Sequence, residues 1–102
     1  MAILIQPDGS TVAVFPDDGQ SFSLDELQAH VGGYIENIRL PADTTLNGYT
    51  IRTMYVNEDG RMQNLEHNLN ASTIAGTHIV GNALALFPVS YTHLTLPTIL
   101  RV

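Results

Sequence analysis

The stretch from residue 22 to residue 37 limits the possible folds most, because it encodes a helix, its end and the start of a strand. Ser23 and Glu26 have the spacing of a capping box, in which each side chain accepts a backbone N–H at the helix start. Gly32 stands where a left-handed C-terminal cap is needed, and a second glycine lets the chain turn back as a strand. We therefore predict a helix over residues 23–31.

One face of this predicted helix is apolar. Leu24, Leu27 and Val31 follow one another at spacings of three and four residues, which places them in one stripe. Phe22, just before the cap, is expected to pack on Leu27 as a hydrophobic staple. The stripe predicts that the helix packs on a sheet.

Apolar and β-branched segments, separated by turn residues, predict strands along the rest of the chain. These segments are residues 2–6, 11–15, 34–40, 50–57 and 78–87. The first two form a predicted hairpin, because Pro7-Asp8-Gly9 between them is a turn sequence. Residues 42–48 are expected to be a loop, and Glu58-Asp59-Gly60 a turn that closes the fourth strand.

A short helix is expected near residues 70–76, with Asn70 or Ser72 as its N-terminal cap and Gly76 at its end. Together these elements predict an α+β fold. Its sheet is mixed, mainly antiparallel and of about five strands, with the 23–31 helix packed on one face.

The last predicted strand has one face of small residues. Gly81, Ala83 and Ala85 alternate along it and share that face with Ile79. Small side chains allow close approach by a neighbouring element, so we expect the 23–31 helix to pack there.

Charge and cysteine content exclude several classes of function. Ten acidic residues against four arginines give a formal net charge of −6. General DNA binding and binding to an anionic membrane are therefore not expected, because both need clustered positive charge. The absence of cysteine and the lack of any long apolar run predict a cytoplasmic protein with no disulfide and no membrane span.

The C-terminal residues have an unusual sequence. Residues 89–98 resemble the in-frame translation of a transposase-type sequencing-library adapter. This resemblance implies a gene from environmental (metagenomic) DNA that lacks its native C-terminus. We accordingly expect a single α+β domain over residues 1–88 and a non-native tail over residues 89–102, to which no function is assigned.

Three patches of the sequence stand out together: Val31-Gly-Gly-Tyr-Ile-Glu36, Val56-Asn-Glu-Asp-Gly60, and Asn68-Leu-Asn-Ala71 taken with Ile79-Val-Gly81. In their order and spacing they resemble a small domain-of-unknown-function family of bacteriophages, plasmids and other mobile elements. The resemblance runs from about residue 22 to residue 86. It implies a phage or mobile-element origin, and therefore a place in the cytoplasm of a host bacterial cell, but no agreed activity, catalytic residue or cofactor.

The spacing of reactive side chains does not predict an enzyme. The histidines lack the helical spacing of a metal site, and a surface ion pair with Glu26 accounts for His30. No serine lies in a nucleophile elbow. The Gly32-Gly33 pair follows a helix, whereas a phosphate cradle precedes one. We therefore expect no catalytic residue, no metal and no cofactor.

A set of polar residues is the best candidate for a binding site. Its members are Tyr34, Arg39, Arg52, Asn57, Arg61, Asn68 and Asn70. Arginine forms bidentate bonds to phosphate, asparagine reads amide or base edges, and tyrosine stacks on rings. The alternative is that the arginines balance neighbouring acids on a solvated face.

Two functions follow from these patterns. In a phage setting, the first is a non-enzymatic counter-defence sponge, a homo-oligomer that sequesters a small anionic nucleotide used as an immune signal. It predicts that Arg39, Arg52 and Arg61 converge on one pocket, and it would be excluded if they pointed to three unrelated surfaces. The alternative is an acidic protein-interaction inhibitor or nucleic-acid mimic that acts on a host protein. It requires the acids to form a continuous ridge.

Overall fold

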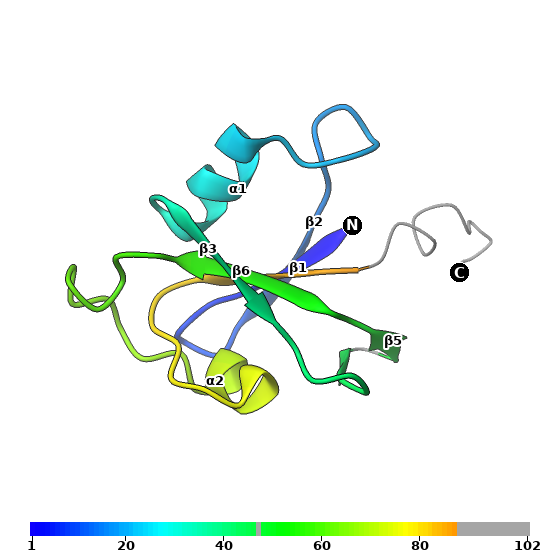
Figure 1. Ribbon diagram of the computed structural model, residues 1–102. Helices are drawn as coiled ribbons and strands as arrows, with labels where there is room; N and C mark the ends of the chain where they lie inside the picture. Colours follow the sequence, from blue (N-terminus) through cyan, green and yellow to red (C-terminus); the bar gives the residue numbers. More distant parts are fainter. Residues whose placement is uncertain (47, 88–102) are drawn as a thin grey trace.

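A computed structural model describes residues 1–46 and 48–87 of the chain. The elements are β1 (Ala2–Ile5), β2 (Thr11–Val14), α1 (Leu24–Val31), β3 (Ile35–Arg39), β4 (Thr45–Leu46), β5 (Tyr49–Thr50), β6 (Thr53–Asn57), α2 (Leu69–Ala75) and β7 (Ala83–Leu86). Five strands form one sheet in the order β2-β1-β7-β6-β3, and β4 and β5 form a separate hairpin. Every pair of neighbouring strands in the sheet is antiparallel. Figure 1 shows α1 on one side of this sheet and α2 on the other. The predicted α+β fold is confirmed.

The helix α1 begins and ends where its local sequence predicts. The Ser23 hydroxyl accepts the Glu26 N–H at 3.2 Å, and the Glu26 carboxylate accepts the Ser23 N–H at 2.8 Å. Gly32 closes the helix with φ of 83°, a left-handed conformation that suits glycine. The predicted stripe is wrong in one member: Leu27 and Val31 are buried, but Leu24 is 58% exposed. As the first residue of the helix, Leu24 lies outside the contact with the sheet.

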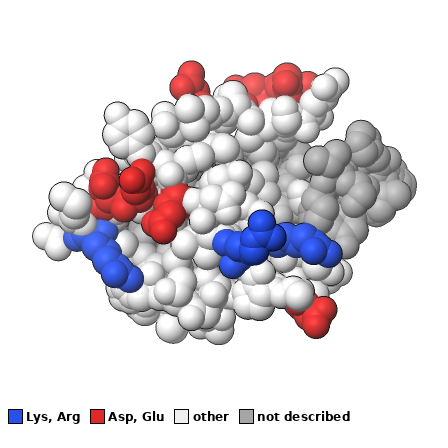
Figure 2. Space-filling model, viewed as in Figure 1, with Lys and Arg blue, Asp and Glu red and all other residues white. Residues whose placement is uncertain are grey.

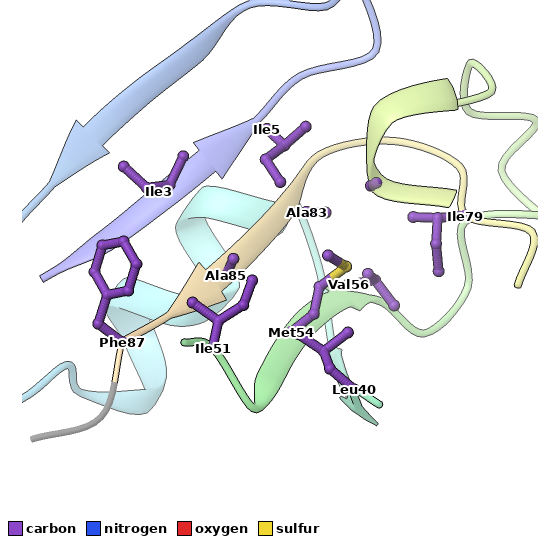
Figure 3. Packing of buried hydrophobic residues seen from close by; sticks show 11 residues of the cluster. Ile3, Ile5, Leu40, Ile51, Met54, Val56, Ile79, Ala83, Ala85 and Phe87 are labelled. Carbon is purple, nitrogen blue, oxygen red and sulfur yellow. The ribbon is translucent and has the colours of Figure 1, made fainter. Parts of the chain in front are cut away.

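The two faces of the sheet carry different apolar clusters. On the α1 side, Ala2, Leu4 and Leu84 pack with Leu27 of the helix. On the other side, β1, β6 and β7 contribute side chains that pack with Ala71 of α2. Figure 3 shows the side chains of Ile3, Met54 and Ala85 from these three strands. This second cluster also holds Leu40, Ile51, Ile79 and Phe87.

The expectation that α1 packs over the small residues of the last strand is wrong. Ala83 and Ala85 belong to the cluster on the α2 side, whereas Leu84 between them contacts the α1 cluster. Side chains alternate between the two faces of a strand, so the small face and the α1 face are opposite faces of β7. The space over Ala83 and Ala85 is filled by larger neighbours, Ile3 and Met54 among them.

All five predicted strands are shorter in the structure, and the last two are shortened most. The 50–57 segment is interrupted after Thr50, because Ile51 turns into the core and is 0% exposed. Residues before the break form β5, which pairs with β4 inside the segment predicted to be a loop. The 78–87 segment pairs continuously only from Ala83, because Gly81 takes a φ of 75° and bends the chain.

The helix α2 lies near the predicted position, but its cap differs. Asn68 is the N-terminal cap and accepts the Ala71 N–H at 3.1 Å, so the predicted caps Asn70 and Ser72 are wrong. Gly76 ends the helix as expected. Ser72 instead donates its hydroxyl to the Asn68 carbonyl at 2.7 Å from within the helix.

Candidate functional site

Arg39 and Arg52 lie side by side at one end of the sheet. Arg39 is the last residue of β3 and pairs with Thr53, the first residue of β6. One residue beyond this pair, the Leu40 N–H donates a hydrogen bond of 2.9 Å to the Arg52 carbonyl. The sheet thus holds two arginines on adjacent chain segments, and we call them the arginine pair.

Neither side chain of the arginine pair is neutralised within the described chain. Both residues are exposed, and neither guanidinium forms an ion pair or hydrogen bond with another described residue. Two like charges held on adjacent segments repel each other, which costs free energy unless an anion or solvent screens them. No ion pair in the described part of the chain accounts for the arginine pair.

Arg61 lies elsewhere, in the loop after β6. It lines a cleft of about 250 Å³ together with Glu36 of β3 and Glu58. Arg39 and Arg52 are not among the residues that line this cleft. Figure 2 agrees: basic side chains lie in two separate places on this face, and the group at the left adjoins acidic side chains. The three arginines do not converge on one pocket, because they divide into the arginine pair and Arg61.

The cleft has a mixed lining rather than a basic one. Glu36 lies opposite Val56 in the ladder, and the Glu58 N–H donates to the Tyr34 carbonyl at 2.8 Å, so the two glutamates are diagonal neighbours. Two carboxylates beside one guanidinium leave a net negative lining, which disfavours a phosphate ligand in this cleft.

A stacked pair of histidines borders the cleft and was not predicted. The rings of His67 and His78 are parallel, with centroids 4.7 Å apart, and the His67 Nε2 lies 3.3 Å from the Ser72 hydroxyl. An antiparallel bridge between His67 and Val80 brings the two segments together, and no local sequence signal reports it. Across residues 1–46 and 48–87, no group of three His, Cys, Asp or Glu side chains is placed to hold a metal ion.

Two asparagines of the predicted site serve the fold instead. Asn57 is 5% exposed and donates to the Val31 carbonyl at 3.3 Å and to Gln63 at 3.2 Å. Asn68 is 0% exposed and donates to the carbonyls of Ile5 and Gly81 at 2.9 and 2.8 Å. Their amide groups form internal hydrogen bonds, and Asn57 also belongs to the lining of the cleft that holds Arg61.

The remaining predicted site residues are exposed but distant from the arginine pair along the fold. Tyr34 is 68% exposed and lies just before β3, at the opposite end of that strand from Arg39. Asn70 is exposed on α2, where its amide approaches the Gly9 carbonyl at 3.5 Å. Among the predicted binding residues, the structure brings Arg39 and Arg52 together at one end of the sheet, and Asn57 and Arg61 together in the lining of the cleft.

His30 and the acidic residues also differ from their expected arrangement. Both Glu26 oxygens accept backbone N–H groups, from Ser23 and Asp17, and not the predicted His30. The His30 ring instead packs edge-to-face with the Phe22 ring, with the ring centroids 6.2 Å apart. On the face shown in Figure 2, acidic side chains lie in separate places and do not form a continuous ridge. That spacing does not favour a nucleic-acid mimic.

Comparison with protein families identifies the domain. The family model described as a domain of unknown function (DUF3846) matches residues 1–98. The chain belongs to this family. The match covers the whole sheet of the DUF3846 domain, both helices and the arginine pair. It continues through residues 89–98, whose adapter origin stays a prediction that lies outside the described residues.

The family assignment confirms the expected small domain of unknown function, and the family description names no activity. Comparison with curated proteins and with solved structures finds no match. In the described part of the DUF3846 domain, neither helix has the length and apolar character needed to cross a bilayer.

Proposed function

We propose that this DUF3846 domain is a non-enzymatic binder of a small anionic ligand, and that the arginine pair is its anion-binding site. The observation that carries the proposal is the placement of two exposed guanidinium groups on adjacent segments with no acidic partner in the described chain. An anion between Arg39 and Arg52 relieves their mutual repulsion and forms charge-assisted hydrogen bonds with both.

The chemistry of the arginine pair favours a phosphate group over a carboxylate. A guanidinium offers parallel N–H donors that match two oxygens of one phosphate, and a phosphate has enough oxygens for both arginines. Each hydrogen bond to a charged group contributes about 1.5–3 kcal/mol. The arginine pair is thus suited to the phosphates of a nucleotide, and no catalytic group is needed for binding.

The three sequence patches resemble a family of phages and mobile elements. In that setting, such a binder would act as a counter-defence sponge for a nucleotide-derived immune signal. The arginine pair lies at an exposed end of the sheet, so one subunit covers only part of a nucleotide. Small-molecule sites bury most of their ligand. We therefore propose that a second copy covers the rest, which makes the functional form a homo-oligomer.

Isothermal titration with a panel of cyclic and ADP-ribose-type nucleotides tests the proposal. Arg39→Gln and Arg52→Gln are each expected to weaken binding at least about tenfold, because each removes charge-assisted bonds to the anion. Arg61→Gln is the matched control and should leave the affinity unchanged, since Arg61 lies in the separate, acidic cleft. Loss of binding in Arg61→Gln with full binding in the other two variants would overturn the assignment.

A release assay separates a binder from an enzyme. The complex is denatured by heat and the released ligand is identified by mass spectrometry. A sponge returns the nucleotide unchanged, whereas an enzyme returns a product. Turnover by the wild-type chain would refute the non-enzymatic function even if the arginine pair binds the ligand.

A further inference from the structure

The sheet has two free edges of opposite character. β3 forms one edge and carries Glu36 and Arg39, charged residues that discourage pairing with another strand. β2 forms the other edge, pairs only with β1 and has the uncharged sequence Thr-Val-Ala-Val. An uncharged edge strand is a template for a further strand.

The backbone groups that β2 leaves free follow from the hydrogen bonds of β1. The Gln6 N–H donates to the Ser10 carbonyl, and the Phe87 N–H donates to the Met1 carbonyl. Since bonding alternates along an antiparallel strand, the even-numbered residues from Ser10 to Val14 face β1. The N–H and carbonyl groups of Thr11, Ala13 and Phe15 therefore point outward, and no other described residue bonds to them.

Apolar side chains flank this outer edge. Val12 is 46% exposed and Phe15 is 64% exposed, although both lie in or next to a regular strand. Exposed apolar residues beside unpaired backbone groups are the features that strand addition uses: the backbone supplies affinity and the side chains supply specificity.

Both ends of the outer edge are acidic. Asp8 precedes β2 in its turn, and Asp17 and Asp18 follow Phe15 after Pro16. Hydrogen bonds from the Ser10 hydroxyl and from the Gln20 N–H lower the pKa of Asp8 and Asp18 respectively, so both stay charged near neutral pH. The edge is thus an uncharged strand with a negative group at each end.

This charge pattern argues against a second copy of the chain as the occupant. Two β2 strands related by a two-fold axis run antiparallel, so the turn that holds Asp8 in one copy would meet Asp17 and Asp18 of the other. Like charges at both ends of the paired strands destabilise such a dimer.

We propose that the outer edge of β2 binds an extended segment of another protein by strand addition. The segment has apolar or β-branched residues at its centre and basic residues at both ends. Its backbone bonds to Thr11, Ala13 and Phe15, its apolar residues cover Val12 and Phe15, and its basic residues pair with Asp8 and with Asp17 or Asp18.

Amide hydrogen exchange measured by NMR tests this interaction on the whole chain, with the synthetic peptide Lys-Lys-Val-Thr-Val-Thr-Lys-Lys as the probe. In the free protein, the amides of Thr11, Ala13 and Phe15 should exchange faster than those of Val12 and Val14. Saturating peptide should slow exchange at the three outward amides at least about tenfold. Protection by the peptide elsewhere, or no protection, would overturn the proposal.

Charge variants supply the controls. The peptide with Glu in place of each Lys should not protect the outward amides. Asp17→Asn should weaken binding of the basic peptide about threefold to tenfold, because it removes one charge without altering a described hydrogen bond. Asp43→Asn, in the loop between β3 and β4, is the matched control and should bind as the wild type does. Equal weakening by both variants would show only a general charge effect and would refute the site.

Analytical ultracentrifugation of the free protein tests whether a second copy of the chain occupies the outer edge of β2. A dimer that itself protects Thr11, Ala13 and Phe15 would overturn the proposal in favour of self-association. A nucleotide-dependent oligomer that leaves these three amides unprotected would support the proposed function alone, so the two proposals fail separately.

Discussion

At the scale of single residues, Asn57 and Asn68 join the sheet to segments outside it. Both are buried, and their amides donate to backbone carbonyls of α1, of β1 and of the segment before β7. A buried polar group that loses its partner costs about 1–3 kcal/mol, so these amides stabilise the contacts between those segments. From the sequence alone, either asparagine could bind a ligand or bond to the protein's own backbone. Their burial is what favours the second role.

Asn68→Ala is expected to destabilise the domain by about 3 kcal/mol, because it removes the buried hydrogen bonds to the carbonyls of Ile5 and Gly81 together with the cap of α2. Asn70→Ala is the matched control, with an expected effect within about 0.5 kcal/mol, because Asn70 is exposed and makes one long bond. Urea denaturation followed by circular dichroism measures both. Similar losses in the two variants would contradict the assigned role of Asn68.

At the scale of elements, α1 combines local caps with contact to the sheet. Its start is specified by Ser23 and Glu26, and its end by Gly32, all within the helix or next to it. The contact is narrower than the apolar sequence suggests, because Leu27 and Val31 are buried while Leu24 is exposed. A short helix depends on such contacts, because isolated helices of this length are marginal in water.

Leu27→Asp is expected to unfold the domain, because it places a charge in the cluster with Leu4 and Leu84. Leu24→Asp is a matched control on the same helix. It should change stability by less than about 0.5 kcal/mol, since Leu24 is exposed and an acid in the first turn suits the helix dipole. A thermal melt that Leu27→Asp leaves unchanged would show that α1 is not docked on the sheet.

The helix start also predicts a dependence of stability on pH. Hydrogen bonds from the backbone N–H groups of Ser23 and Asp17 lower the pKa of Glu26 from its ordinary value of 4.5. A lowered pKa in the folded state stabilises the protein above the unfolded value, and this contribution is lost as the pH falls through the folded value. Stability should therefore decline below about pH 4.5.

Glu26→Gln should reduce stability at pH 7 and make the decline below pH 4.5 shallower, because glutamine does not titrate. Asp8 and Asp18 also have lowered pKa values, so part of the decline should remain in the variant. Urea denaturation at a series of pH values measures the difference. Parallel stability curves for the variant and the wild type would show that Glu26 is not the titrating group.

At the scale of the whole molecule, the sheet order places the N-terminal hairpin beside the last described strand. β1 pairs with β7, and β7 pairs with β6, so the centre of the sheet joins segments far apart in the chain. This arrangement leaves β2 and β3 as the edges. The arginine pair lies at one end of the β3 edge, and β2 forms the opposite edge of the sheet.

The sheet order predicts a gradient of amide exchange. Leu84 lies in the central strand and is 0% exposed, so its amide should exchange at least about tenfold more slowly than that of Val12, which bonds inward from the β2 edge. Native-state hydrogen exchange measures both rates in one sample. Equal protection would indicate that β2 opens only with the whole domain.

The sequence by itself determined the elements whose signals are local. The capped helix, the hairpin at Pro7-Asp8-Gly9 and the end of α2 at Gly76 depend on residues within a few positions of one another, so they could be predicted. The polar ligand set stays a prediction, because amide and guanidinium side chains serve both binding and structure. The structure divides that set: Arg39 and Arg52 lie together at one end of the sheet, and Asn57 and Arg61 line a separate cleft.

The tertiary structure decided everything that depends on contact between distant segments. The β1–β7 pairing sets which face of β7 meets α1, and it buries Asn68 against Ile5. The β3–β6 register brings Arg39 next to Arg52, while the loop after β6 carries Arg61 to a different cleft. These outcomes follow from packing free energy summed over the whole domain, and no short stretch of sequence contains it.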